Sequence, residues 1–267
     1  MSRLAPIFVA ALLGASVAPA HPELEDALAR INAQISAAPS DAELYLSRGE
    51  LYAQHSQGTQ AEANFLRAAE LNPDLPRLDQ VRGKLALDRR EFREAVVLLT
   101  RALAREPKDI IARIYRARAN RALNNHPAAL ADYREAFSRL PAVRPELLLE
   151  YAGVLPPADA VRQIDESIAQ TGPVPALVSR ALELELALGR TEAALQRLDR
   201  IATTSERKEA WLKRRGDILA AVGRTREAAA AYLAARDALA TLPAWLRESP
   251  ETANLSAELD RLTSHQS

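Results

Sequence analysis

The sequence predicts an all-α protein, a solenoid of stacked antiparallel helix pairs with a capping helix at each end. Three observations lead to this fold class. Ala, Leu, Arg and Glu, which favour helices, are abundant, whereas only nine of the 267 residues are glycine. Prolines recur at 34-residue intervals through the first half of the chain. An alanine followed four residues later by a large apolar residue recurs with the same spacing, and a period of this length is typical of stacked repeats.

The first twenty residues are predicted to be a cleaved export signal. The segment "MSRLAPIFVAALLGASVAPA" has one basic residue, then an apolar run, and ends in the small-x-small pattern that a signal peptidase accepts. The apolar run, residues 4–17, is shorter than the roughly 20 residues that a membrane-spanning helix needs. We therefore expect an exported protein, periplasmic or secreted, that is cleaved near Ala20 and is not inserted in the membrane afterwards. The absence of cysteine excludes disulfides, thiol catalysis and cysteine-bound metal.

Each predicted repeat consists of two helices and a polar turn. The second helix carries the alanine and the large apolar residue on one face, and a proline ends it. One pair cannot bury its apolar face alone, so neighbouring pairs are expected to stack. The prolines are Pro39, Pro73, Pro107 and Pro141. The paired positions are Ala27/Ile31, Ala61/Phe65, Ala95/Leu99, Ala129/Tyr133, Ala160/Ile164, Ala194/Leu198 and Ala228/Tyr232.

These patterns predict the following organisation. Residues 1–20 are the signal peptide, 21–40 an N-terminal capping helix, 41–242 about six repeats, and 243–267 a C-terminal capping helix and tail. The fourth repeat, residues 142–173, is expected to be irregular, because Pro156 and Pro157 shorten its turn and shift the period by three residues. In the last helix, Ser249 is the expected N-cap and Pro250 the first helical residue.

The repeat resembles the tetratricopeptide repeat (TPR) over about residues 23–242. In the first copy the matching positions are Tyr45, Gly49, Tyr52, Ala61, Phe65, Ala68 and Pro73. The chain is thus similar to exported bacterial members of this family. The resemblance implies a right-handed solenoid whose first helices line a concave surface, where peptides usually bind. The chain departs from the usual pattern at the residue before the glycine, where Arg48, Arg82 and Arg215 stand in place of leucine.

The sequence contains no constellation typical of an enzyme or a metal site. The four histidines are scattered through turns and tails, and none belongs to an HExxH motif. Glu183 and Glu185 lie two positions apart on a predicted helix and therefore face different directions. No glycine-rich phosphate loop or GxSxG nucleophile motif occurs. We predict a non-enzymatic protein without cofactor or metal.

Charge is unevenly distributed along the chain. Residues 21–75 contain 3 basic and 9 acidic residues, a net charge of −6, whereas residues 76–140 contain 15 and 8, a net charge of +7. From residue 141 onward, 16 basic and 18 acidic residues give −2. An acidic first segment is thus followed by a basic one.

The basic segment suggests a peptide-binding groove. By the resemblance, the concave residues of the first three repeats are Leu46, Glu50, Gln80, Lys84, Leu87, Ile114, Arg118 and Arg121. This mixture of apolar and basic residues suits an acidic peptide or a free C-terminal carboxylate. The lysine and asparagine clamp of the chaperone-binding members is not intact, so only a general protein or peptide partner is expected.

The same charges bear on two other kinds of partner, a second copy of the chain and a nucleic acid. The acidic and basic segments could drive head-to-tail self-association, which would make the chain a structural subunit of itself or of an envelope complex. A nucleic-acid partner is not expected, because aromatic residues for base stacking are lacking near the basic segment, apart from Tyr115.

Overall fold

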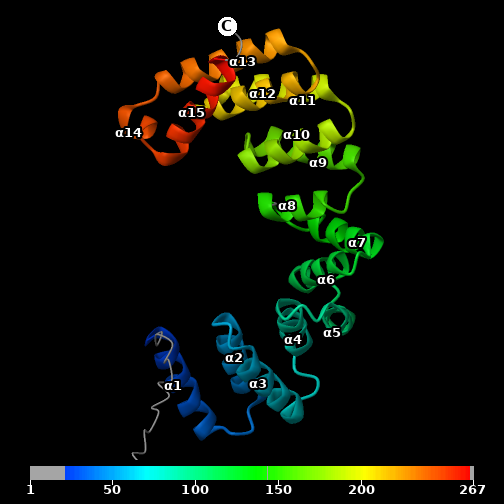
Figure 1. Ribbon diagram of the computed structural model, residues 1–267. Coiled ribbons are helices and arrows are strands. Elements are labelled where there is room, and N and C mark those ends of the chain that lie inside the picture. Colours follow the sequence, from blue (N-terminus) through cyan, green and yellow to red (C-terminus); the bar gives the residue numbers. More distant parts are fainter. Residues whose placement is uncertain (1–21, 143, 265–267) are drawn as a thin grey trace, which may run out of the picture. The chain divides into compact units, whose positions relative to one another are not determined.

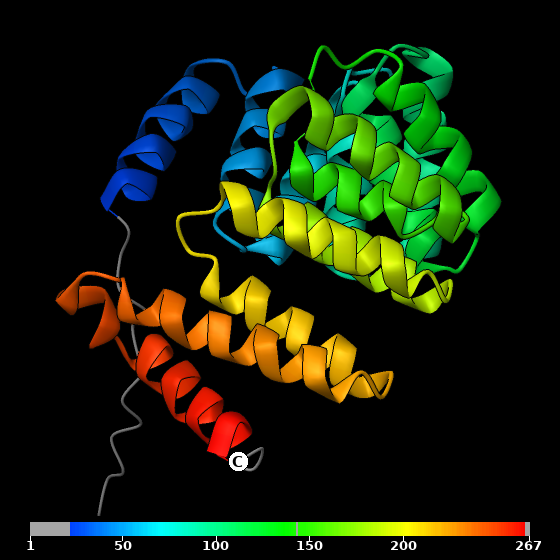
Figure 2. The ribbon, with the colours of Figure 1, turned by 90° about the horizontal axis from the view of Figure 1, so that it is seen from above.

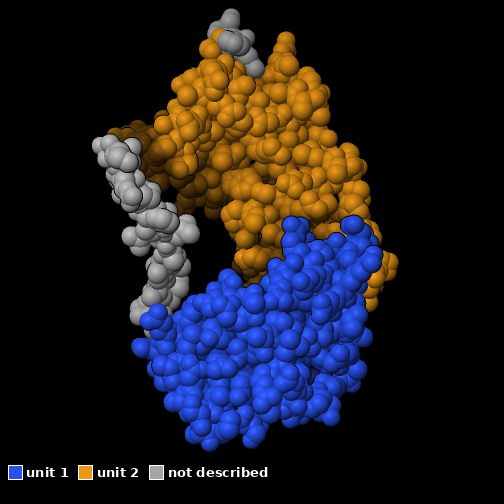
Figure 3. Space-filling model, turned by 60° about the horizontal axis from the view of Figure 1, so that its bottom comes forward, with its two compact units in different colours: residues 1–124 blue, residues 125–267 orange. Residues whose placement is uncertain are grey.

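The computed structural model describes residues 22–142 and 144–264, which form fifteen helices and no strand (Figure 1). The prediction of an all-α protein is confirmed. The predicted export signal and its cleavage point lie outside the described residues. The chain divides into two compact units, residues 1–124 and 125–267, which Figure 3 distinguishes by colour.

Unit 1 consists of one helix, two helix pairs and a last helix, α6, that packs against α5. α2 packs against α3, and α4 against α5, in the order that the repeat predicts, while α1 packs against α2. The core of the first pair contains Ala61, Phe65 and Ala68, all fully buried. The helices of the unit are α1 (Pro22–Ala37), α2 (Ala42–Gln54), α3 (Gly58–Leu71), α4 (Leu78–Asp88), α5 (Phe92–Arg105) and α6 (Ile110–Ala122).

Unit 2 continues the series of pairs and ends in a helix that covers the last pair. α15 packs against α13, as Figures 1 and 2 show, and its Leu259 is fully buried in the core of the unit. Ser249 Oγ accepts a hydrogen bond from the Thr252 amide at 3.3 Å, which confirms the predicted N-cap. The helices are α7 (His126–Phe137), α8 (Pro145–Ala152), α9 (Pro157–Thr171), α10 (Pro175–Ala187), α11 (Thr191–Thr204), α12 (Glu209–Ala221), α13 (Thr225–Ala240), α14 (Ala244–Arg247) and α15 (Pro250–Ser264).

The turns between paired helices repeat one backbone conformation. Ser56 and Arg90 in unit 1 have φ of 59° and 65°, and Gly189 and Gly223 in unit 2 have φ of 70° and 77°. Each of these residues follows the first helix of a pair and adopts the left-handed conformation that reverses the chain after a helix. Unit 2 places glycine where this conformation costs least.

Glycine in the first helix allows the two helices of a pair to approach closely. A Cβ atom built on Gly49 would lie 2.5 Å from the Phe65 ring, and one on Gly83 would lie 2.6 Å from Leu99 Cγ. The large side chain of the second helix therefore packs on the glycine of the first helix in the same pair. This contact explains why the two positions recur together in the sequence.

The arginine before this glycine links consecutive repeats. Arg48 donates to Asn32 Oδ1 at 2.7 Å, and Arg215 donates to Asp199 Oδ1 at 2.7 Å. In both cases the partner lies 16 residues earlier, on the preceding helix: Asn32 on α1 and Asp199 on α11. Arg82 forms an ion pair with Glu62 on α3 at 2.8 Å. The guanidinium groups thus join neighbouring helix pairs.

The fourth repeat has a shortened first helix. α8 contains eight residues, whereas α10 and α12 contain thirteen each. Pro156 is the N-cap of α9 and Pro157 its first helical residue. Proline lacks an amide hydrogen and tolerates the first turn of a helix, so the pair of prolines ends the turn early and starts α9.

Candidate functional site: a groove in unit 1

A groove with a volume of about 440 Å³ lies between the first helices of the repeats in unit 1. α2 and α4 supply most of its wall, and Phe65 of α3, Arg77 before α4 and the first turns of α6 supply the rest. The lining residues are Glu50, Ala53, Gln54, Phe65, Arg77, Gln80, Val81, Lys84, Leu85, Asp88, Ile111 and Tyr115.

The middle of the groove is apolar. Phe65 and Leu85 are buried and form part of the hydrophobic core beneath it. Ile111 at the start of α6 is 50% exposed, one of the large apolar side chains that unit 1 leaves in contact with water. Val81 and Tyr115, both half-buried, complete this surface. An exposed apolar surface within a groove is typical of a binding site.

The charged residues of the groove form two ion pairs. Arg77 pairs with Glu50, and Lys84 Nζ lies 2.6 Å from Asp88 Oδ2. Burial raises the pKa of the Glu50 carboxyl, and the charge of Arg77 opposes this effect. Because each cation has an acid beside it, the lining residues carry no excess charge.

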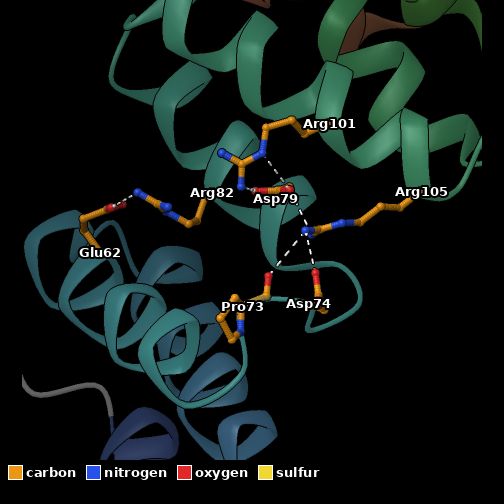
Figure 4. A network of polar contacts seen from close by, with 7 residues as sticks. All are labelled: Glu62, Pro73, Asp74, Asp79, Arg82, Arg101 and Arg105. Atoms are coloured by element: carbon orange, nitrogen blue, oxygen red, sulfur yellow. Dashed lines mark hydrogen bonds and ion pairs between the residues drawn. The ribbon is translucent and has the colours of Figure 1, made fainter.

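A polar network holds α4, which contributes five residues to the groove (Figure 4). Asp79, only 2% exposed, accepts hydrogen bonds from Arg101 Nη2 at 2.7 Å and from Arg105 Nη1 at 3.0 Å. Arg105 also donates to Asp74 Oδ1 at 3.2 Å, in the loop before α4. The neighbouring Gln80 amide donates to Asp109 Oδ2 at 2.7 Å, just before α6. α4 is thus fixed to α5, to its own preceding loop and to the start of α6.

Three of the eight predicted groove residues line this groove, namely Glu50, Gln80 and Lys84. Leu46 and Ile114 are instead core residues, 1% and 8% exposed, so they offer almost no contact surface to a ligand. Leu87, Arg118 and Arg121 are not among its lining residues, and the Arg118 guanidinium stands 5.8 Å from the centre of the Tyr115 ring.

The sequence prediction missed Arg77, Val81, Ile111 and Tyr115. Ile111 and Tyr115 lie four residues apart and therefore share one face of α6, which a helical-face count could have detected. The position of Arg77 has no such signal, because this residue precedes α4 in a left-handed conformation with φ of 65°. Its side chain reaches Glu50 across 27 positions of the chain.

Two kinds of feature are absent from the part of the chain that the structure describes. Among residues 22–142 and 144–264, no three His, Asp or Glu side chains are grouped so that they could hold a metal ion. Within the same residues, no helix is both long and apolar enough to cross a membrane.

Comparison with known families agrees with this architecture. The family described as "Tetratricopeptide repeat" matches residues 81–142, and "Tetratricopeptide repeat-like domain" matches residues 167–251. Together the two matches cover more than half of the chain. The chain therefore belongs to the tetratricopeptide repeat family, and its fold class is the α-solenoid of that family. No curated protein sequence matches the chain.

Solved structures of tetratricopeptide repeat proteins share the fold at low sequence identity. PilW, a type IV pilus biogenesis factor, is 18% identical with a TM-score of 0.58, covering 68% of this chain and 86% of its own. A tetratricopeptide repeat protein from Parabacteroides merdae ATCC 43184 is 17% identical with a TM-score of 0.55, covering 91% and 93%. YrrB is 18% identical with a TM-score of 0.56, covering 63% and 89%. At these identities the likeness shows the fold alone.

Proposed function

We propose that the chain is an exported, non-enzymatic adaptor that binds another protein, and that the groove of unit 1 holds an apolar segment of that partner. The half-exposed Ile111 carries this proposal. It lies in a groove whose apolar surface is not covered by the described residues of unit 1, and covering such surface yields roughly 25 cal/mol per Å². The charges around it are already paired and need no partner.

The comparisons support this proposal by analogy. YrrB is a TPR protein with an unusual peptide-binding site, and PilW is a type IV pilus biogenesis factor. Export rests on the first twenty residues, whose charge, apolar run and Ala18-Pro19-Ala20 ending suit a signal peptide. A periplasmic location would bring the adaptor to an envelope partner.

The proposal is tested by introducing a negative charge into the groove. Peptides selected from a random display library on the full chain are titrated by calorimetry into the wild type and into Ile111→Glu. We expect at least a tenfold loss of affinity, because the ligand would have to bury an unpaired carboxylate. The matched control is Val97→Glu on α5, since Val97 is 58% exposed, is not a lining residue of the groove and is also branched at Cβ. The control should bind within twofold of the wild type.

Equal binding by the wild type and Ile111→Glu would place the binding surface elsewhere. If the library yields no peptide and the only ligand found is a second copy of the chain, the structural-subunit alternative replaces the adaptor. Circular dichroism of both variants verifies that they remain folded.

A further inference from the structure

A second groove, with a volume of about 420 Å³, lies in unit 2 between α10 and α12. α10 contributes Ser179, Leu182 and Glu183, and α12 contributes Ala210, Trp211 and Arg214. Ser179 and Glu183 are four residues apart and Trp211 and Arg214 three apart, so each pair shares one face of its helix. The two faces meet at the groove.

Part of the lining of this groove is apolar and held in place. Leu182 is 2% exposed and belongs to the core of unit 2. Trp211 is half-buried and packs against the same core, while the rest of its side chain lines the groove. A tryptophan fixed in this way offers a large contact area at little cost in side-chain entropy.

The lining also carries a cation that the described residues of unit 2 do not neutralise. Arg214 is exposed, and among the described residues it has no hydrogen bond or ion pair. Its neighbour Lys213, by contrast, is held by Asp217 at 3.2 Å and by Glu258 of α15 at 2.7 Å. Glu183, the acid that lines the same groove, is paired with Arg180 at 3.1 Å.

We propose that this second groove binds a protein segment that combines a carboxylate with a neighbouring aromatic or branched apolar side chain. The guanidinium of Arg214 matches a carboxylate in charge and can donate two parallel hydrogen bonds to it. Trp211, which packs on the core that contains Leu182, receives the apolar side chain. The groove of unit 1 pairs its cations internally, so the acidic ligand expected from the sequence belongs in unit 2. This proposal concerns a separate site and does not depend on the groove of unit 1.

The two tryptophans of the chain allow a direct measurement of occupancy. Trp245 on α14 is exposed, so Trp245→Phe in the full chain leaves Trp211 as the single fluorescent indole with little risk to folding. Peptides are selected on this variant from a random display library and titrated while Trp211 emission is recorded. Each selected peptide is also synthesised with its acidic residue replaced by the amide. The protein variants are Arg214→Gln and, as a control, Arg226→Gln on α13, an exposed arginine that does not line the groove.

We expect selected peptides to share the acidic and apolar pair and to change Trp211 emission. Replacing the peptide carboxylate by the amide should weaken binding about tenfold or more, since hydrogen bonds to charged groups are the stronger ones. Arg214→Gln should lower the affinity for the acidic peptide by a similar factor. This variant should bind the acidic and the amide peptides with equal affinity. Arg226→Gln should retain both the affinity and the preference.

The proposal is overturned if no peptide changes Trp211 emission, if the selected peptides lack an acidic residue, or if Arg214→Gln keeps the preference for the carboxylate. Peptides that Ile111→Glu weakens and Arg214→Gln does not would belong to the groove of unit 1. The two sites can therefore fail separately.

Discussion

At the scale of single residues, a glycine decides how closely the helices of a pair can approach. A Cβ atom on Gly216 of α12 would lie 2.3 Å from Cε1 of Tyr232, a distance that real Cβ contacts do not show. Tyr232 is 3% exposed and donates its hydroxyl to Asp217 Oδ1 at 3.2 Å, so its ring has little freedom to move. Burial, and then the Asp217 carboxylate, raise the pKa of this hydroxyl.

We therefore expect Gly216→Ala to lower the free energy of unfolding by about 1–3 kcal/mol, the usual cost of overpacking a core. This loss is net of the roughly 1 kcal/mol by which alanine favours a helix interior over glycine. Urea denaturation followed by circular dichroism measures it. As a control, Gly216→Ala combined with Tyr232→Leu should be less destabilised than the sum of the two single changes, because leucine makes room for the new methyl group. If Gly216→Ala is as stable as the wild type, α12 and α13 can move slightly apart without any loss in the free energy of unfolding.

At the scale of elements, buried charge rather than apolar packing fixes part of α4. Asp79 is enclosed by the guanidinium groups of Arg101 and Arg105 from α5, as Figure 4 shows. We expect Asp79→Asn to lower the free energy of unfolding by about 1–2 kcal/mol, because two charge-assisted hydrogen bonds become neutral. The loss stays below that of a fully buried pair, since both arginines are about half exposed and can be hydrated instead.

The matched control for this prediction is Asp74→Asn. Asp74 also pairs with Arg105, at 3.2 Å, but its side chain is 90% exposed. Exposed pairs contribute little, so this variant should stay within about 0.5 kcal/mol of the wild type in the same denaturation experiment. Equal effects of the two substitutions would contradict the role assigned to burial.

The same elements show what could be predicted from the sequence. The positions of the helix pairs and the Ser249 cap depend on local spacing, which a sequence displays directly. The burial of Asp79 depends on partners 22 and 26 residues away, and the contact of Arg77 with Glu50 spans 27 residues. These contacts depend on how far side chains reach between helices, which the sequence does not display. The sequence therefore indicates the charged residues of the predicted groove but not the ion pairs that they form. The register of the repeat alone predicts that Leu46 and Ile114 lie on the concave surface, although apolar residues at such positions also face the core.

At the scale of the whole molecule, the uneven charge of the sequence is largely neutralised within unit 1. The acids of the first segment pair with bases of the second: Glu50 with Arg77, Glu62 with Arg82, and Asp74 with Arg105. Residues 22–124 contain 16 basic and 15 acidic residues, a net charge of +1. Three of the nine acids in the first segment are thus paired with bases of the second segment within one chain.

We accordingly expect the full chain to show the mass of a single molecule at both low and high salt. Attraction between charged surfaces is strongest where screening is weak, and the Debye length falls from about 30 Å at 0.01 M to about 3 Å at 1 M. Size-exclusion chromatography with light scattering at these two ionic strengths, over a range of protein concentrations, measures the mass. Oligomers present at low salt and dissolved at high salt would mean that unpaired charges outside these three pairs dominate the surface, and would favour a self-assembling subunit. Oligomers that persist at high salt would indicate apolar contacts between molecules. Ile111 would then be the first residue to substitute, because Ile111→Glu should dissociate such oligomers and Val97→Glu should not.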